Sequence, residues 1–179
     1  MKTHKLTTIG LFTAILCILG PIAIAVPFSP VPISLGTLGV LLACLVLSPS
    51  DACVCTGLYL LLGFVGLPVF TGFVGGVGRL FGPTGGYMIG YLPLAWVGGK
   101  LALRFKKHMP LQALGLFLGM CLCYLFGTIW LAFQSQLSFL SALWMGVIPY
   151  VPFDIVKIAA ALLFARAIRR RLGAFLDKS

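Results

Sequence analysis

The segment "VIPYVPFDIVKIAAALLFARAIRRR", residues 147–171, has the pattern of a membrane-spanning helix. A helix needs about 20 predominantly apolar residues to cross a bilayer, and this segment holds a long apolar run that ends in a cluster of arginines. Two charged residues, Asp154 and Lys157, interrupt its other end. A charge at the centre of a bilayer costs about 2.5–3.5 kcal/mol on insertion scales, so buried charges of this kind need partners or a function.

The composition extends this interpretation to the whole chain. Of its 179 residues, 60% are hydrophobic and only 9% are charged, whereas about 25% of a soluble domain is charged. Segments such as "GVLLACLVLS" (39–48) are continuous apolar runs, unlike the alternating strands of a membrane barrel. The chain is therefore predicted to be an all-α integral membrane protein, with residues 1–179 forming a single transmembrane domain.

The apolar segments predict a bundle of six transmembrane helices, at about 6–26, 33–48, 52–66, 86–104, 111–134 and 153–169. Pro21 is expected to bend the first helix rather than end it. The N-terminal segment also has features of a cleaved signal peptide, but its apolar run is long enough to span, so we expect it to be retained. The Pro-rich stretch 27–32 and the Gly-rich stretch 66–87 are expected to be irregular, and a short helix is expected within 134–152.

The net charge of +10 reflects topology in this interpretation, so no nucleic acid is expected as a partner. In a six-span arrangement most basic residues fall on the side of both termini. They are Lys2, Lys5, Lys100, Arg104, Lys106, Lys107, Arg166, Arg169, Arg170, Arg171 and Lys178. The positive-inside rule places that side, and both termini, in the cytoplasm. Asp51 and Asp177 fall on the same side, which leaves Arg79, Asp154 and Lys157 as the charges of the outer half.

These three outer charges mark the candidate functional site. Asp154 and Lys157 are one helical turn apart, on one face of their helix. Arg79 lies in the Gly-rich stretch, and irregular backbone at membrane depth persists only where protein or a water-filled cavity satisfies it. We expect the three charges to share one cavity that opens outward and, with net charge +1, favours an anion. The alternative is a buried ion pair that only fixes helix packing.

Other kinds of site find less support in the sequence. The segment "GGVGRLFGPTGG" (75–86) lacks the Gly-Lys-[Ser/Thr] that closes a phosphate-binding loop. The two Cys-x-Cys pairs would point to opposite faces of a helix, so we expect neither a metal site nor disulfides, and no cofactor. No catalytic constellation is present, although a small membrane enzyme using Asp154 and Lys157, or a channel, remains an alternative.

A pair of small residues, Gly10 and Ala14, lies in the first predicted helix. Small residues four positions apart let two helices approach closely. The pair is expected either to pack within this chain or to form the interface with a partner protein.

Four segments together resemble a known family. "GLPVFTGFVGGVGRLFGPTGGYMIGYLP" (66–93) and "GVIPYVPFDIVKIAAA" (146–161) are similar to the BioY family, the biotin-specific substrate-binding subunits of energy-coupling-factor (ECF) transporters. "PVPISLGTLGVLLA" (30–43) and "YLFGTIWLA" (124–132) fit the same family. The resemblance covers nearly the whole chain, and Arg79 is a departure from it, because many relatives have an uncharged residue there.

The resemblance implies six membrane helices, a high-affinity biotin pocket near the outer face, and transport rather than catalysis. It also implies a separate module with a transmembrane coupling protein and two ATPase subunits as partners. Transport of a biotin precursor, or of another small organic anion or vitamin, is the alternative.

Biotin also suits the candidate residues chemically. Its carboxylate matches Lys157 or Arg79, and its ureido N–H groups match a carboxylate such as Asp154. The remaining candidates are aromatic residues that would cover the apolar side of the ring system and glycines that would permit tight turns and a close approach to the ligand. They are Phe70, Phe73, Tyr87, Tyr150, Gly75, Gly76, Gly85 and Gly86.

Overall fold

The computed structural model describes the backbone of residues 2–27 and 29–176. Asp177 and Lys178, which the topology prediction places on the cytoplasmic side, lie outside the described residues, as do the side chains of Lys2 and Arg171.

The described chain is a bundle of helices with one very short strand pair. In chain order the elements are α1 (Lys2–Leu19), β1 (Ala23–Ile24), β2 (Ile33–Ser34), α2 (Gly36–Val46), α3 (Pro49–Phe64), α4 (Val77–Leu80), α5 (Gly85–Pro93), a π-helical turn η1 (Leu94–Gly98), α6 (Gly99–Arg104), α7 (Met109–Gln134), α8 (Phe139–Gly146) and α9 (Val151–Leu176). The elements α5, η1 and α6 follow one another without a break and form one continuous helical segment. The wider π turn directly follows Pro93, which lacks the N–H needed for a regular helical hydrogen bond.

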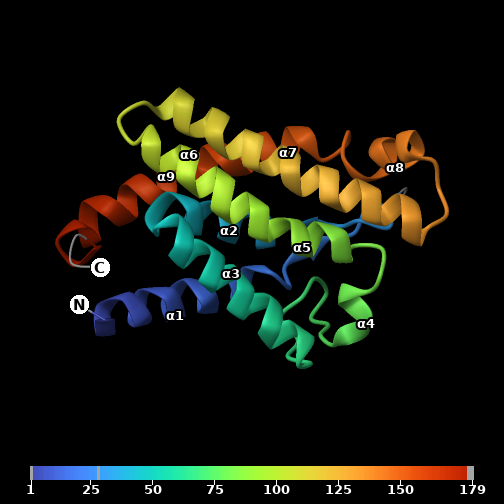
Figure 1. The fold of residues 1–179 in the computed structure, drawn as a ribbon, viewed down its shortest axis with the longest axis horizontal. Coiled ribbons are helices and arrows are strands. Elements are labelled where there is room, and N and C mark those ends of the chain that lie inside the picture. The colour runs from blue at the N-terminus through green and yellow to red at the C-terminus, as the bar shows by residue number, and fades with distance from the viewer. Residues whose placement is uncertain (1, 28, 177–179) are drawn as a thin grey trace.

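The longer helices run side by side along the long axis of the molecule (Figure 1). The main packing partners are α5 with α7, α2 with α9, and α1 with α3. The first turn of α1 and the last turns of α9 lie at the same end of the bundle, and α4 and α8 lie at the opposite end (Figure 1). The interior is apolar, with Leu16, Leu41, Leu94 and Met120 fully buried.

The first helix ends earlier than the sequence predicts. We expected a bent helix to about residue 26, but α1 ends at Leu19. Gly20 packs directly against Tyr59 and the carbonyl of Val69, and Pro21 has no N–H to continue the helix. The chain then forms β1, which pairs antiparallel with β2 in the register Ala23↔Ser34 and Ile24↔Ile33, so the Pro-rich stretch becomes the connection between two strands.

Local sequence signals explain several other helix ends. Ser48 caps α3 by accepting a hydrogen bond from the Asp51 N–H, and Pro49 occupies the first helical position. Ser138 caps α8 in the same way through the Ser141 N–H. The helix α8 is the short helix expected within 134–152, and α4, with four residues, is the helical part of the Gly-rich stretch.

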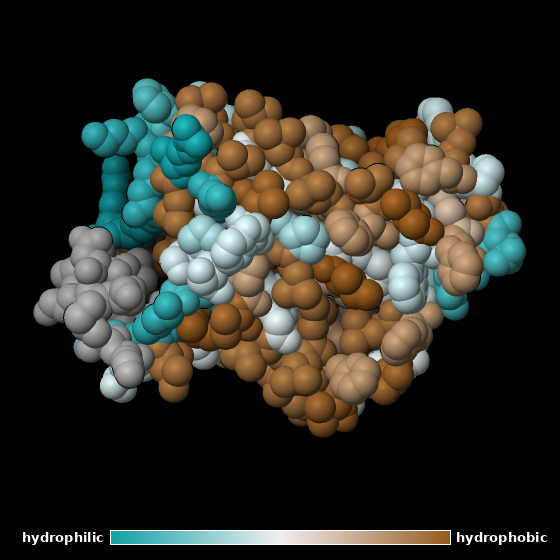
Figure 2. All heavy atoms as spheres, in the orientation of Figure 1, coloured by the Kyte–Doolittle hydropathy of each residue, from teal (hydrophilic) through white to brown (hydrophobic). Residues whose placement is uncertain are grey.

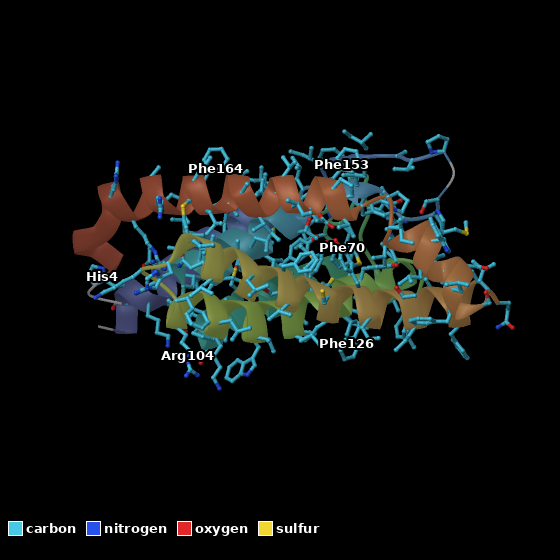
Figure 3. The ribbon with its side chains drawn as sticks, turned by 90° about the horizontal axis from the view of Figure 1, so that it is seen from above. His4, Phe70, Arg104, Phe126, Phe153 and Phe164 are labelled. Carbon is cyan, nitrogen blue, oxygen red and sulfur yellow. The ribbon has the colours of Figure 1, made fainter. Side chains whose placement is uncertain are left out.

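The surface of the bundle is mostly apolar (Figure 2). Phe126, Phe153 and Phe164 point outward, whereas Phe70 lies in the interior (Figure 3). Hydrophilic residues gather at the end that holds the start of α1 (Figure 2), and His4 and Arg104 lie there (Figure 3). This is the arrangement of a protein with an apolar belt and one basic end.

Most helices in the structure are shorter than the six membrane spans that the sequence predicts. Among the described residues, α7 is the one helix that is long and apolar enough to cross a bilayer by itself. The helices α8 and Val151–Arg170 are long and apolar enough only when taken together, and they meet at a bend of 50°. Thr3–Leu19, Gly36–Val46 and Pro49–Phe64 are shorter apolar helices. The count of six full-length spans is therefore not established by helix length.

Candidate ligand-binding site

Asp154 lies at the centre of a buried polar cluster. It sits in the first turn of α9 and is 5% exposed. Its Oδ1 is 2.9 Å from the Nζ of Lys157, and its Oδ2 accepts a hydrogen bond of 2.5 Å from the Tyr124 hydroxyl. Both contacts are charge-assisted, which makes them stronger than neutral hydrogen bonds.

Lys157 links this cluster to a third helix. Its Nζ donates to Thr37 Oγ1 at 3.0 Å as well as to Asp154. The four side chains thus come from α2, α7 and α9, three segments far apart in the sequence. Because a buried charge is stable only when paired and hydrogen-bonded, this network explains how the membrane interior accommodates Asp154 and Lys157.

A small cavity of about 60 Å³ opens above the cluster. Its lining is aromatic and apolar, apart from the cluster and Ser34. The lining residues are Val31, Pro32, Ile33, Ser34, Thr37, Tyr87, Tyr91, Met120, Cys123, Tyr124, Gly146, Tyr150, Asp154 and Lys157. An apolar pocket with a few convergent polar groups is the usual form of a small-molecule site.

Two of the tyrosines differ in how their hydroxyls are satisfied. The Tyr150 hydroxyl donates to the carbonyl of Val31, which ties the start of α9 to the β1–β2 connection. The Tyr87 hydroxyl is buried and interacts with the Thr128 hydroxyl, although neither group makes a hydrogen bond of good geometry to a described residue. Tyr87 also lines the cavity.

Arg79 lines a different cavity from Asp154 and Lys157. This second cavity has a volume of about 300 Å³ and is lined by Ala23, Ala25, Val26, Ser29, Pro30, Pro32, Thr71, Gly72 and Arg79. The expectation that all three outer charges share one cavity is therefore wrong. The β1–β2 connection lies between them, and the two cavities have Pro32 in common.

The two predicted phenylalanines do not line either cavity. Phe70 is fully buried and packs edge-on against Tyr59, with ring centroids 5.6 Å apart. Phe73 is 70% exposed and has a positive φ of 58°. The sequence analysis expected both to cover the apolar side of the ligand's ring system, but one belongs to the core and the other faces outward.

None of the four predicted glycines lines either cavity, and three of them lie against protein. A Cβ on Gly75 would meet the Leu67 carbonyl, and one on Gly85 would meet the Leu80 carbonyl. Gly86 packs against Trp130, whose indole N–H donates to the Gly82 carbonyl. Gly76 has a φ of 95°, which favours glycine. Gly75, Gly85 and Gly86 let the chain fold tightly between α3 and α5, where they lie against backbone or an aromatic ring, whereas a Cβ on Gly76 would meet no atom within 4 Å.

The sequence profile of the BioY family matches residues 1–174. The chain belongs to the BioY family. Curated relatives cover almost its whole length. A biotin transporter of Lactococcus lactis subsp. cremoris is 38% identical over 96% of this chain and 93% of its own, and a biotin transporter of Thermotoga maritima is 34% identical over 93% and 96%.

Solved structures agree with this assignment. The chain matches the S-component for biotin from an ECF-type ABC transporter with a TM-score of 0.87, at 31% identity, over 94% of this chain and 92% of the other. It shares its fold with the S component of another bacterial ECF transporter at 20% identity and a TM-score of 0.59, over 98% and 99% of the two chains. The protein is accordingly an all-α membrane protein of the cell membrane, in a family of transporters rather than enzymes.

Some residues of the candidate pocket were not singled out from the sequence. Tyr124 and Thr37 hold the charged pair, and Tyr91 lines the cavity beside them. Tyr124 and Thr37 do lie within the segments "YLFGTIWLA" and "PVPISLGTLGVLLA" that carry the family resemblance. A search of those segments for polar side chains would have found them.

The small-residue pair of α1 faces outward. Gly10 and Ala14 are both exposed, and a Cβ on Gly10 would meet no atom within 4 Å. The opposite face of α1 packs on α2 and α3. Packing within the described chain therefore does not explain the pair. The six cysteines are all free, and no group of three or more His, Cys, Asp or Glu residues among the described residues could hold a metal ion.

Proposed function

We propose that this protein takes up biotin across the cytoplasmic membrane, as the high-affinity substrate-binding subunit of an ECF transporter. The observation that carries the proposal is the buried Asp154–Lys157–Tyr124–Thr37 cluster at the base of an aromatic cavity. It occurs in a chain whose relatives are biotin transporters.

The chemistry of Asp154 suits the ureido ring of biotin. An ionised carboxylate offers about four acceptor positions, and Lys157 and Tyr124 occupy two of them. A remaining position can accept from one of the two ureido N–H donors, because the N–H bonds of a cyclic urea diverge. The Tyr87 hydroxyl lines the same cavity and adds a donor or acceptor for the polar edge of the ligand. Tyr91 and Met120 line the same cavity and provide apolar surface for the sulfur-containing ring. Biotin is in this account the transported ligand and not a cofactor.

The proposed topology has six membrane crossings within one substrate-binding domain, residues 1–179. The crossings are α1, α2, α3, the continuous segment α5–η1–α6, α7 and α9. The first turn of α1 and the last turns of α9 share the hydrophilic end of the bundle (Figures 1 and 2). By the positive-inside rule this end, with both termini, is cytoplasmic. The Asp154 cavity then lies toward the outer face, from which the vitamin arrives.

The proposed partners are a transmembrane coupling protein and two ATPase subunits. The solved relative for biotin is a component of an ABC transporter, and the Gly-rich stretch of this chain lacks a nucleotide-binding signature. The exposed Gly10–Ala14 strip on α1 offers a flat surface against which a helix of the coupling protein can pack closely.

Uptake of radiolabelled biotin tests this function. Cells that lack their own biotin transporter are supplied with this chain, with or without a coupling module. The expected result is uptake of biotin that excess unlabelled biotin abolishes and excess dethiobiotin reduces less. Equal competition by the precursor would assign the precursor as a substrate, and no uptake of either compound would contradict the proposal.

A further inference from the structure

Arg79 is a partly buried cation with no acidic partner among the described residues. Two aspartates are described, and each is paired with another residue: Asp51 with Lys5 at 2.8 Å, and Asp154 with Lys157. The Nε of Arg79 is buried and has no hydrogen-bond partner among the described residues. A buried donor without an acceptor destabilises the structure around it. The Nε–H group is therefore a donor available to an acceptor from outside the described residues.

The cavity beside Arg79 is suited to an organic acid rather than to a bare inorganic ion. Its polar side chains are the hydroxyls of Ser29 and Thr71 and the guanidinium of Arg79, and the rest of its lining is mostly apolar. A guanidinium presents a planar fork of donors that matches a carboxylate, while the apolar lining can cover an aliphatic chain.

Lys157 is a weaker candidate for the same carboxylate. Its ammonium group already lies 2.9 Å from Asp154 Oδ1 and 3.0 Å from Thr37 Oγ1. The Asp154–Lys157 pair is neutral as a unit, so the region around it attracts an uncharged polar group more than an anion. Arg79 carries the unbalanced positive charge.

The volumes of the two cavities also favour a ligand that occupies the Arg79 cavity. Small-molecule sites commonly measure about 300–1,000 Å³. The cavity at Asp154 has only about 60 Å³, whereas the cavity at Arg79 has about 300 Å³. They meet at Pro32, so one elongated ligand can extend from one into the other.

We propose that the Arg79 cavity is a second subsite that binds the carboxylate of the ligand, while the Asp154 cavity binds its uncharged head. This inference rests on the proposed function, because it assigns the two ends of biotin to two cavities. The favoured substrates are organic acids in which an aliphatic chain joins the carboxylate to an uncharged ring that donates hydrogen bonds.

Isothermal titration with biotin and biotin methyl ester tests the assignment. The unaltered protein should bind biotin at least about tenfold more tightly than the ester, because the ester lacks a charge-assisted hydrogen bond. In Arg79→Gln the two compounds should bind about equally tightly. The affinity for biotin should fall, while the affinity for the ester should stay unchanged. Arg104→Gln, at the opposite end of the bundle (Figure 3), should keep the preference.

The alternative outcomes separate this inference from the proposed function. If Arg79→Gln keeps the preference for biotin, or weakens both compounds equally, the second subsite is refuted. If the unaltered protein binds both compounds equally, the subsite is refuted and biotin binding stands. If the unaltered protein binds neither compound, the proposed function fails and the subsite with it.

Discussion

Replacing Asp154 by Asn removes the charge that both Lys157 and Tyr124 contact. The Lys157 side chain is only 11% exposed, so its ammonium keeps Thr37 as a partner but loses its carboxylate. Breaking one partner of a buried ion pair costs about 3–5 kcal/mol. For a chain of this size, that corresponds to a fall in melting temperature of about 6–20 °C.

The same substitution should weaken biotin binding about ten- to hundredfold. An asparagine has one side-chain acceptor oxygen, so it cannot serve Lys157, Tyr124 and a ureido N–H group together. Losing a hydrogen bond to a charged group costs about 1.5–3 kcal/mol, and 1.4 kcal/mol is a factor of ten in affinity. Thermal unfolding in detergent measures the first effect, and isothermal titration with biotin measures the second.

The double variant Asp154→Asn with Lys157→Met separates stability from binding. Removing both charges leaves no unpaired ion, so the melting temperature should recover most of its loss. Biotin affinity should not recover, because the carboxylate acceptor is still missing. If affinity returns together with stability, the ion pair is structural and the reasoning about the ligand is refuted, as it is if Asp154→Asn binds biotin normally.

Three further predictions follow from the contacts described above. Tyr124→Phe should destabilise the protein by about 1.5–3 kcal/mol, because it removes a charge-assisted hydrogen bond, whereas Tyr59→Phe, which removes a neutral bond to a carbonyl, should cost about 0.5–1.5 kcal/mol in the same unfolding assay. Gly10→Leu with Ala14→Leu should retain biotin binding but lose co-purification with the coupling module and ATP-driven uptake, since both positions face outward. Reporter fusions at the C-terminus and in the 134–138 loop should report opposite sides of the membrane.

Each of these predictions has a contrary result. Equal destabilisation by the two tyrosine variants would show that Asp154 does not need the Tyr124 hydroxyl. Gly57→Leu adds a similar bulk at an open position of α3 and should leave uptake unchanged. Loss of uptake in that control would remove the case for a specific strip on α1. Identical reporter signals would contradict the six-span topology.

The fold class could be predicted from composition because a long apolar run has few alternatives in a membrane. The helix ends were less predictable where tertiary contacts decide them. Pro21 is compatible with a bent helix, and the end of α1 at Leu19 depends on packing of Gly20 against Tyr59, a residue about 40 positions away. Only the folded chain brings those two residues together.

The charged pair of the site could also be predicted, because Asp154 and Lys157 lie one turn apart on one helix. Their partners could not, because Thr37 and Tyr124 reach the pair from other helices. Arg79 shows the limit of reasoning from charge alone. It belongs to α4, at the opposite end of the bundle from the start of α1 (Figure 1), but the β1–β2 connection separates it from the other two charges.

The neighbours of the glycines in residues 75–86 could not be predicted from the sequence either. Glycine permits a close approach, but the sequence does not show what approaches. At Gly85 the neighbour is the backbone of Leu80, and at Gly86 it is the ring of Trp130. A glycine that approaches a ligand and a glycine that approaches a packed side chain look the same in a single sequence.

The most direct test of the central claim is to identify the small molecule that the protein carries. The protein is purified in detergent from cells grown with biotin, washed, denatured, and the released material is analysed by mass spectrometry. The Asp154→Asn/Lys157→Met variant is treated in parallel. The account predicts biotin from the unaltered protein and a small fraction of that amount from the variant. Equal amounts from both proteins, or no biotin from the unaltered protein, would contradict it.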